Sequence, residues 1–181
     1  MNRFATILVL LTMTINAFAQ TYKMPAETLQ HEGTWLQWPH HYEYGISYRN
    51  RLDSTWVAMT RALVGSEKVH IIAYNTTEQT RITNLLSTAG VSLTNIDFKL
   101  FQTNDVWVRD NGPIFVRDSV GKLNIEDWGF NGWGGDFNYN LCNPIPTSVA
   151  NAIGMPVVNL NSVMTIEGGS YELDGKGVLL A

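Results

Sequence analysis

Apolar positions along the chain follow two spacings, one typical of helices and one typical of strands. Leu52, Trp56, Met59 and Leu63 recur at intervals of three or four, which places them on one face of a helix that ends at Gly65. The same criteria predict helices over 47–65, 76–90 and 147–154, and strands over 34–38, 68–74, 96–102, 113–118, 122–127, 156–160, 163–168, 170–175 and 177–181. Because strands alternate with helices, we expect an α/β protein with mixed sheets.

The first residues have a different pattern. Arg3 precedes an apolar stretch over residues 4–15, and Ala17-Phe18-Ala19 follows it. Small residues at these positions predict a secretory signal peptide, residues 1–19, cleaved after Ala19. The alternative is a membrane anchor, for which the apolar run is short. We therefore expect a secreted or periplasmic protein with no membrane segment after cleavage.

Composition narrows the class of protein. The chain has 181 residues, of which 45% are hydrophobic, and a net charge of −4, as in one soluble globular domain over residues 20–181. This acidity argues against a nucleic-acid partner. The only cysteine is Cys142, which excludes an internal disulfide and a Cys-rich zinc site. No histidine follows it, so we expect a structural thiol and not a nucleophile. No metal or cofactor is expected.

A short pattern occurs three times along the chain. An acidic residue and a glycine lead into a strand at Glu32-Gly33, at Asp110-Asn111-Gly112 and at Glu167-Gly168-Gly169. The second and third continue into predicted hairpins that turn at "DSVGK" and "DGKG". Such units, each a small sheet with a helix, predict a propeller-like ring.

Carboxylates at the same place in successive units would converge on the axis of that ring. Converging carboxylates suit a cation, and two of them hold a planar guanidinium through paired hydrogen bonds. The alternative is that each carboxylate caps a turn or pairs locally. On a strand, Arg109 and Asp110 would point to opposite faces, so Asp110 is expected to take a partner from elsewhere.

Four longer motifs carry a family resemblance. The segments "MPAETLQHEGTWLQWP", "NDVWVRDNGPIFV", "WGFNGWGG" and "IEGGSYELDGKGVLL" resemble, in this order, the motifs of the agmatine deiminase family, which includes the Porphyromonas-type peptidyl-arginine deiminases. The resemblance implies the pentein fold, an α/β propeller of five ββαβ-type units around a pseudo-fivefold axis. It also implies a thiol hydrolase without cofactor, in which a cysteine attacks the guanidinium carbon, ammonia leaves and water releases a ureido product.

The resemblance also implies roles for individual residues. Asp110 matches an aspartate that binds the guanidinium, and Glu167 matches the glutamate that orients the catalytic histidine and the substrate. Trp107 is a candidate wall for the alkyl chain of the substrate, or else a core tryptophan. Trp133, with the glycines Gly132, Gly134 and Gly135, either shapes the mouth of the pocket or forms a glycine-permitted aromatic loop.

The family's His-x-Asp motif and its nucleophilic cysteine lie downstream of "EGGS", beyond Ala181. We therefore expect the N-terminal part of a deiminase, an incomplete pentein ring that is inactive alone. The expected reaction is conversion of agmatine to N-carbamoylputrescine and ammonia, in putrescine biosynthesis. The alternatives are deimination of peptidyl-arginine, or a non-catalytic module that binds guanidinium or polyamine ligands. Self-association into a homo-oligomer is left open.

Overall fold

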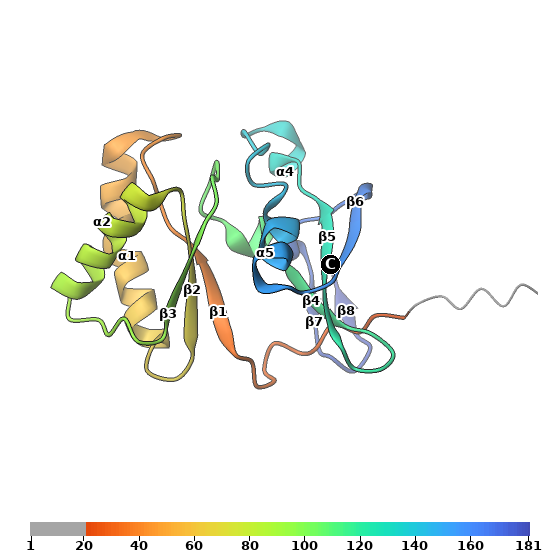
Figure 1. The fold of residues 1–181 in the computed structure, drawn as a ribbon. Helices are drawn as coiled ribbons and strands as arrows, with labels where there is room; N and C mark the ends of the chain where they lie inside the picture. The colour runs from red at the N-terminus through yellow and green to blue at the C-terminus, as the bar shows by residue number, and fades with distance from the viewer. Residues whose placement is uncertain (1–20) are drawn as a thin grey trace, which may run out of the picture.

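The structure is a computed structural model that describes residues 21–181 (Figure 1). The predicted signal peptide, residues 1–19, lies outside the described residues. The described part consists of two α/β units joined by a short loop and one helical turn, followed by a small hairpin.

The first unit is a parallel sheet covered on one face by two helices. Its strands pair in the order β1-β2-β3, and both helices lie on the outer side of the sheet in Figure 1. Parallel strands require crossover connections, which helices supply here. The elements are β1 (Gly33–Gln37), α1 (Gly45–Leu63), β2 (Lys68–Ala73), α2 (Thr76–Thr88) and β3 (Ile96–Leu100).

Side chains of β2 alternate between two cores. Val69, Ile71 and Ala73 are fully buried and pack with the helices α1 and α2. Ile72, on the opposite face, packs with Ile125 of the second unit. Because successive strand residues point to opposite faces, one apolar run serves both cores and joins the two units.

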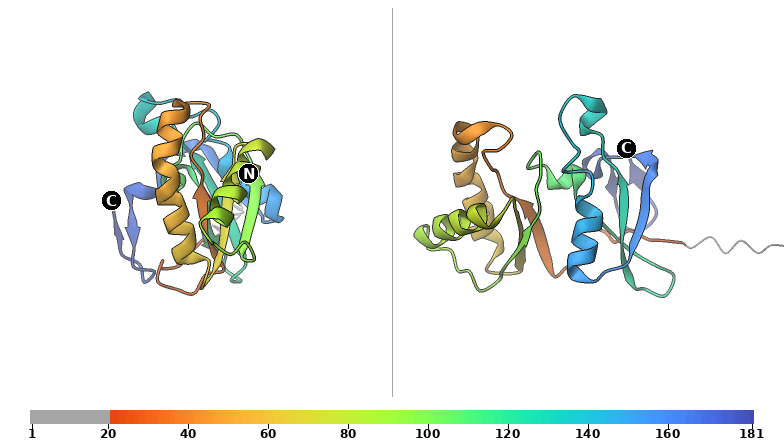
Figure 2. Two further views of the ribbon diagram at one scale, coloured as in Figure 1. Left: turned by 90° about the vertical axis from the view of Figure 1, so that its left-hand side faces the viewer. Right: turned by 45° about the horizontal axis from the view of Figure 1, so that its top comes forward.

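The second unit is a mixed sheet with one main helix. β4 pairs antiparallel with β5, and β5 pairs parallel with β6. Ile145 and Val149 of α5 pack into the core that both units share, and α5 lies between the two sheets in Figure 1 and in the right-hand view of Figure 2. The elements are α3 (Val108–Asn111), β4 (Ile114–Arg117), β5 (Leu123–Gly129), α4 (Gly132–Gly135), α5 (Ile145–Ile153) and β6 (Val157–Thr165).

The third occurrence of the repeated pattern begins a further hairpin. The 3₁₀ turn η1 (Gly168–Ser170) leads into β7 (Glu172–Leu173) and β8 (Leu179–Leu180). The two predicted hairpins are confirmed, and their turns are built alike. Asp118 Oδ1 accepts hydrogen bonds from the second and fourth following amides, and Asp174 Oδ1 does the same.

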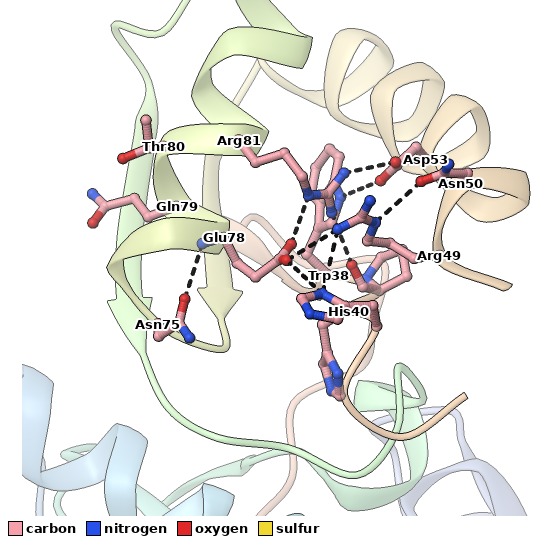
Figure 3. Close-up of polar contacts among 12 residues, drawn as sticks. Trp38, His40, Arg49, Asn50, Asp53, Asn75, Glu78, Gln79, Thr80 and Arg81 are labelled. Atoms are coloured by element: carbon pink, nitrogen blue, oxygen red, sulfur yellow. Dashed lines mark hydrogen bonds and ion pairs between the residues drawn. The ribbon is translucent and has the colours of Figure 1, made fainter. Parts of the chain in front are cut away.

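A polar network fixes the helices of the first unit to the end of β1 (Figure 3). Arg81 pairs with Asp53 at 2.7 Å and with Glu78 at 2.6 Å, and its guanidinium also donates to the Pro39 carbonyl. Arg49 pairs with Glu78 at 3.3 Å. Glu78 is 2% exposed, and the pKa of its carboxyl is lowered because the two guanidinium groups outweigh the effect of burial.

The α/β class is confirmed, and the predicted helices begin and end within two residues of the observed ones. The N-cap of α2 is Asn75, whose Oδ1 accepts the Glu78 amide at 3.0 Å. Two local predictions are wrong. Residues 156–160 and 163–168 do not form two strands, because β6 runs continuously to Thr165 with a register shift opposite Trp128 and Gly129. Asp110 lies on the helical turn α3 and not on a strand.

Candidate functional site

The structure brings the "RDNG" and "EGG" motifs into direct backbone contact. Gly168 packs on the Arg109 carbonyl, and Gly169 packs on the Asp110 side chain. A Cβ atom at either glycine would lie well under 3.0 Å from these atoms, so only glycine permits this approach. Glu167 precedes the two glycines. The segments that contain Asp110 and Glu167 therefore lie side by side, and the convergence of their two carboxylates stays a prediction.

Asp110 is a carboxylate without a cation. It is half-buried, and no side chain of residues 21–181 forms an ion pair or hydrogen bond with it. Its neighbour Arg109 pairs instead with Glu27 and, at 3.3 Å, with Glu172. The expectation that Arg109 does not neutralise Asp110 is thus confirmed, although its premise of a strand was wrong. Asp110 is free to take a cation from outside the described residues.

Trp107 directly precedes α3. Its side chain is 53% exposed, so the alternative that it is a core tryptophan is wrong. The Asn111 side-chain amide donates to the Trp107 carbonyl at 2.9 Å, which ties Trp107 to the same helical turn as Asp110. An exposed indole on the same helical turn as a carboxylate suits an aliphatic cation, since the face of the ring and the charge both attract it.

Asp105 is a second carboxylate that the sequence reasoning did not assign to the site. It is 6% exposed, Oδ1 accepts the Val106 amide at 2.6 Å, and the Tyr44 hydroxyl approaches Oδ2 only to 3.5 Å. Burial raises the pKa of Asp105, and the charges of Asp110 and Glu43 raise it further. Burial also raises the pKa of Tyr44 to about 12, together with the charge of Asp105. In the sequence, the only indication that Asp105 belongs to this region was the concentration of charged residues around Asp110.

Glu43 adds a third carboxylate to this region. Its oxygens accept hydrogen bonds from the side-chain amides of Asn104 at 3.4 Å and Asn138 at 2.5 Å. Within residues 21–181 it has no cationic partner. Two carboxylates of the segment 104–112 and one from the segment before α1 thus have no cationic partner within residues 21–181, which favours a cationic ligand.

The glycine-rich segment around Trp133 has a strained backbone. Trp133 has φ 57° and ψ 53°, a left-handed conformation that costs about 1–3 kcal/mol for a bulky residue. Its ring packs edge-on against Phe130 and Phe137 at centroid distances of 5.1 and 5.7 Å, and Asn131 Oδ1 caps the turn by accepting the Gly134 amide at 2.8 Å. The aromatic loop is thereby present, and the role of Trp133 at a pocket mouth stays a prediction.

Cys142 is fully buried, and burial raises the pKa of its thiol. Both properties disfavour the thiolate that a nucleophile requires. The four histidines make hydrogen bonds elsewhere: His31 with Glu67, His40 with Thr103, His41 with Glu78 and His70 with Asp97. Across residues 21–181 no group of three or more His, Cys, Asp or Glu side chains is arranged to hold a metal ion. The described residues offer carboxylates that favour a cation, and they do not assemble a nucleophile with its base.

Two further features lie apart from these residues. A shallow groove of about 860 Å³ runs between α1 and α2, and it is lined mainly by residues of these two helices and not by Asp110, Trp107, Trp133 or Glu167. None of the helices within residues 21–181 is both long and apolar enough to cross a membrane.

Comparisons with known proteins agree with this geometry. Residues 23–181 match the family of Porphyromonas-type peptidyl-arginine deiminases. Over 170 residues the chain is 30% identical to an agmatine deiminase of Pseudomonas aeruginosa, covering 90% of this chain and 44% of that protein.

Solved structures share the fold. An agmatine deiminase of C. jejuni with substrate bound superposes with a TM-score of 0.78 at 24% identity, covering 90% of this chain and 46% of that chain. An agmatine deiminase of Enterococcus faecalis gives a TM-score of 0.74 at 23% identity, covering 88% and 43%. The chain therefore spans less than half the length of the relatives it matches. The motifs, the fold and the match over nearly all described residues lead to one assignment: this chain belongs to the Porphyromonas-type peptidyl-arginine deiminase family.

Proposed function

We propose that this chain provides the guanidinium-binding part of an enzyme that hydrolyses agmatine to N-carbamoylputrescine and ammonia. Asp110 binds the guanidinium, Trp107 lines the path of the alkyl chain, and Glu167 orients the substrate and the catalytic histidine. Trp133 and its neighbouring glycines lie at the mouth of the pocket. The nucleophile and the general base come from outside the described residues.

One observation carries this proposal. The Asp110 carboxylate, which has no cationic partner within residues 21–181, is packed against Gly169 of the "EGG" motif, and Trp107, three residues earlier at the start of the same helical turn, is exposed. A half-buried carboxylate gains most from a cation that brings its own hydrogen-bond donors, and a guanidinium does so in a planar, paired geometry. The 30% identity to an agmatine deiminase favours agmatine among guanidinium compounds.

The pentein arrangement is part of the same proposal. The two α/β units and the hairpin β7–β8 are read as successive units of a pseudo-fivefold ring, whose axis Asp110 and Glu167 face. Exposed apolar side chains on β6 and β8, Val163 at 70% and Leu180 at 69% exposed, support further units packing at these strands.

Export after cleavage at Ala19 is also proposed, and mass spectrometry of the exported protein tests it, since an intact Met1 would contradict it.

Deimination of peptidyl-arginine is the second candidate, favoured by the family match itself. A non-catalytic module that binds guanidinium or polyamine ligands is the third, and it is supported by a site that, within residues 21–181, has binding groups and no assembled nucleophile. Measurement of turnover distinguishes the three candidate functions. The whole protein that contains these residues should release ammonia from agmatine and form N-carbamoylputrescine, detected by mass spectrometry, at higher kcat/KM than with an arginine-containing peptide.

The variant Asp110→Asn tests the site itself. Removing one partner of a desolvated charge pair costs about 2–5 kcal/mol, so calorimetry should show agmatine affinity lowered at least about 30-fold. Asp118→Asn is the matched control, because Asp118 accepts backbone hydrogen bonds in the β4–β5 turn and an amide oxygen can replace it there. Equal affinity of Asp110→Asn and Asp118→Asn would refute the assignment of Asp110.

A further inference from the structure

The buried sulfur of Cys142 accepts hydrogen bonds from two different segments. The backbone amide of Asn104 lies 3.2 Å from Sγ, and the side-chain amide of Gln37 lies 3.6 Å from it. Cys142 and Gln37 are both fully buried. A buried backbone N–H without an acceptor is costly, so the sulfur satisfies a donor that the loop after β3 would otherwise leave unpaired.

Gln37 connects the same sulfur to the next residue of the loop. Its Nε2 also donates to the Asp105 carbonyl, whereas its Oε1 has no partner within residues 21–181. Its neighbours in the chain, Leu36 of β1 and Trp38 directly after β1, pack in the apolar core, and burying an amide there costs free energy unless it is hydrogen-bonded. The amide therefore orients the Asp105 carbonyl and the Cys142 sulfur, and an apolar side chain at position 37 would leave both without these contacts.

Two more contacts hold this loop from other directions. Asn104 Oδ1 accepts the Leu141 amide at 2.8 Å. The His40 ring bonds to the Thr103 hydroxyl at 3.2 Å through Nε2, since Nδ1 accepts the Tyr42 amide at 3.2 Å. Residues 103–105 are thus tied to β1, to the segment before α1 and to the loop before α5, and two residues later the chain reaches Trp107 and α3.

We propose that Cys142 and Gln37 are positioning residues, which fix the loop 103–105 so that Trp107 and Asp110 are presented to the guanidinium ligand in one geometry. This rests on the proposed function. The thiol acts as a hydrogen-bond acceptor and forms no covalent bond with substrate. A nucleophile would require sulfur, whereas an acceptor can be replaced by an oxygen.

A matched pair of variants separates these roles. Cys142→Ser and Cys142→Ala remove similar volume, and only serine keeps an acceptor for the Asn104 amide. In Cys142→Ala the dissociation constant for agmatine should rise about tenfold, because small displacements of a binding group weaken a fixed geometry strongly. In Cys142→Ser it should stay within about threefold of the wild type, and turnover by the whole protein should persist. Ile82→Val, a core change on α2 at a fully buried residue, controls for loss of stability alone and should leave affinity unchanged.

Hydrogen exchange provides a second measurement that needs no ligand. The Asn104 amide should exchange at least about tenfold faster in Cys142→Ala than in Cys142→Ser, while amides of α2 exchange alike in both. If Cys142→Ala does not fold, Gln37→Met tests the same contacts, since it removes the donor to the Asp105 carbonyl with little change in size, and agmatine affinity should fall.

The outcomes are distinct. Equal agmatine affinity and equal Asn104 exchange in the alanine and serine variants would overturn the proposal. Loss of turnover in Cys142→Ser with binding intact would also overturn it and identify Cys142 as the nucleophile. Absence of agmatine binding in the wild type would overturn the proposed function and with it any role of the two residues in binding, whatever the exchange data show.

Discussion

Adding a single methyl group at Gly169 should displace the Asp110 carboxylate without unfolding the protein. The Cβ of Gly169→Ala would meet Asp110 Oδ1 at a separation that real Cβ atoms do not show. Gly169 has no left-handed backbone conformation, so alanine fits its φ and ψ. The atom in the way is the far end of a flexible side chain, which can rotate away.

The size of the effect follows from the displacement. To restore an ordinary contact of at least 3.4 Å, the carboxylate must move by roughly 1 Å, and a shift of that size can cost up to about a hundredfold where geometry is fixed. We expect the dissociation constant for agmatine to rise about 10- to 100-fold, which is about 1.4–2.7 kcal/mol.

Calorimetric titration with agmatine measures the affinity, and urea denaturation checks the fold. Gly168→Ala is the informative companion, because its Cβ would meet the Arg109 backbone carbonyl, which cannot rotate away. That variant should lose about 1–3 kcal/mol of unfolding free energy. Gly65→Ala is the control, with nothing within 4 Å of the added Cβ, and it should change neither property. Wild-type affinity in a folded Gly169→Ala protein would refute the reasoning that this contact sets the position of the carboxylate.

Three further predictions concern buried polar groups, and a fourth concerns turnover. Arg81→Met leaves the carboxylates of Glu78 and Asp53 short of their shared cation, so urea denaturation should show a loss of about 3–5 kcal/mol; a loss below about 1 kcal/mol would contradict this. Burial lowers the pKa of His40 from 6.5, so as the pH falls the unfolded state takes up the proton before the folded state does. The free energy of unfolding should therefore fall as pH drops below about 6.5, and His40→Asn should reduce this dependence on pH. Because Cys142 is fully buried and burial raises the pKa of its thiol, the thiol should react with a disulfide reagent only after unfolding. Because the described residues assemble no nucleophile with its base, residues 20–181 alone should release no ammonia from agmatine.

Much of the secondary structure could be predicted from the sequence, because it depends on local periodicity. The spacing of Leu52, Trp56, Met59 and Leu63 marks α1 to within two residues, and the turns at "DSVGK" and "DGKG" mark both hairpins. Local patterns were insufficient where two states are close in energy. The alternation of Val106 and Val108 with their neighbours did not indicate that Asp110 lies on a single helical turn. A helix of four residues is stabilised by tertiary contacts and not by helix propensity.

For the candidate site too, some features could be predicted from the sequence and others depend on the tertiary structure. The sequence by itself identified Asp110, Glu167 and Trp107 as candidate site residues, because they stand in the motifs that resemble those of the family. Only the tertiary structure decided that Gly169 lies against the Asp110 carboxylate, that Arg109 is paired with Glu27 and Glu172, and that Trp107 is exposed. It also joined Gln37, Asn104 and Cys142, which lie as far as 105 residues apart in the chain. Contacts of this kind depend on the packing of β1 against the second unit. Local sequence patterns do not show which segments far apart in the chain come into contact.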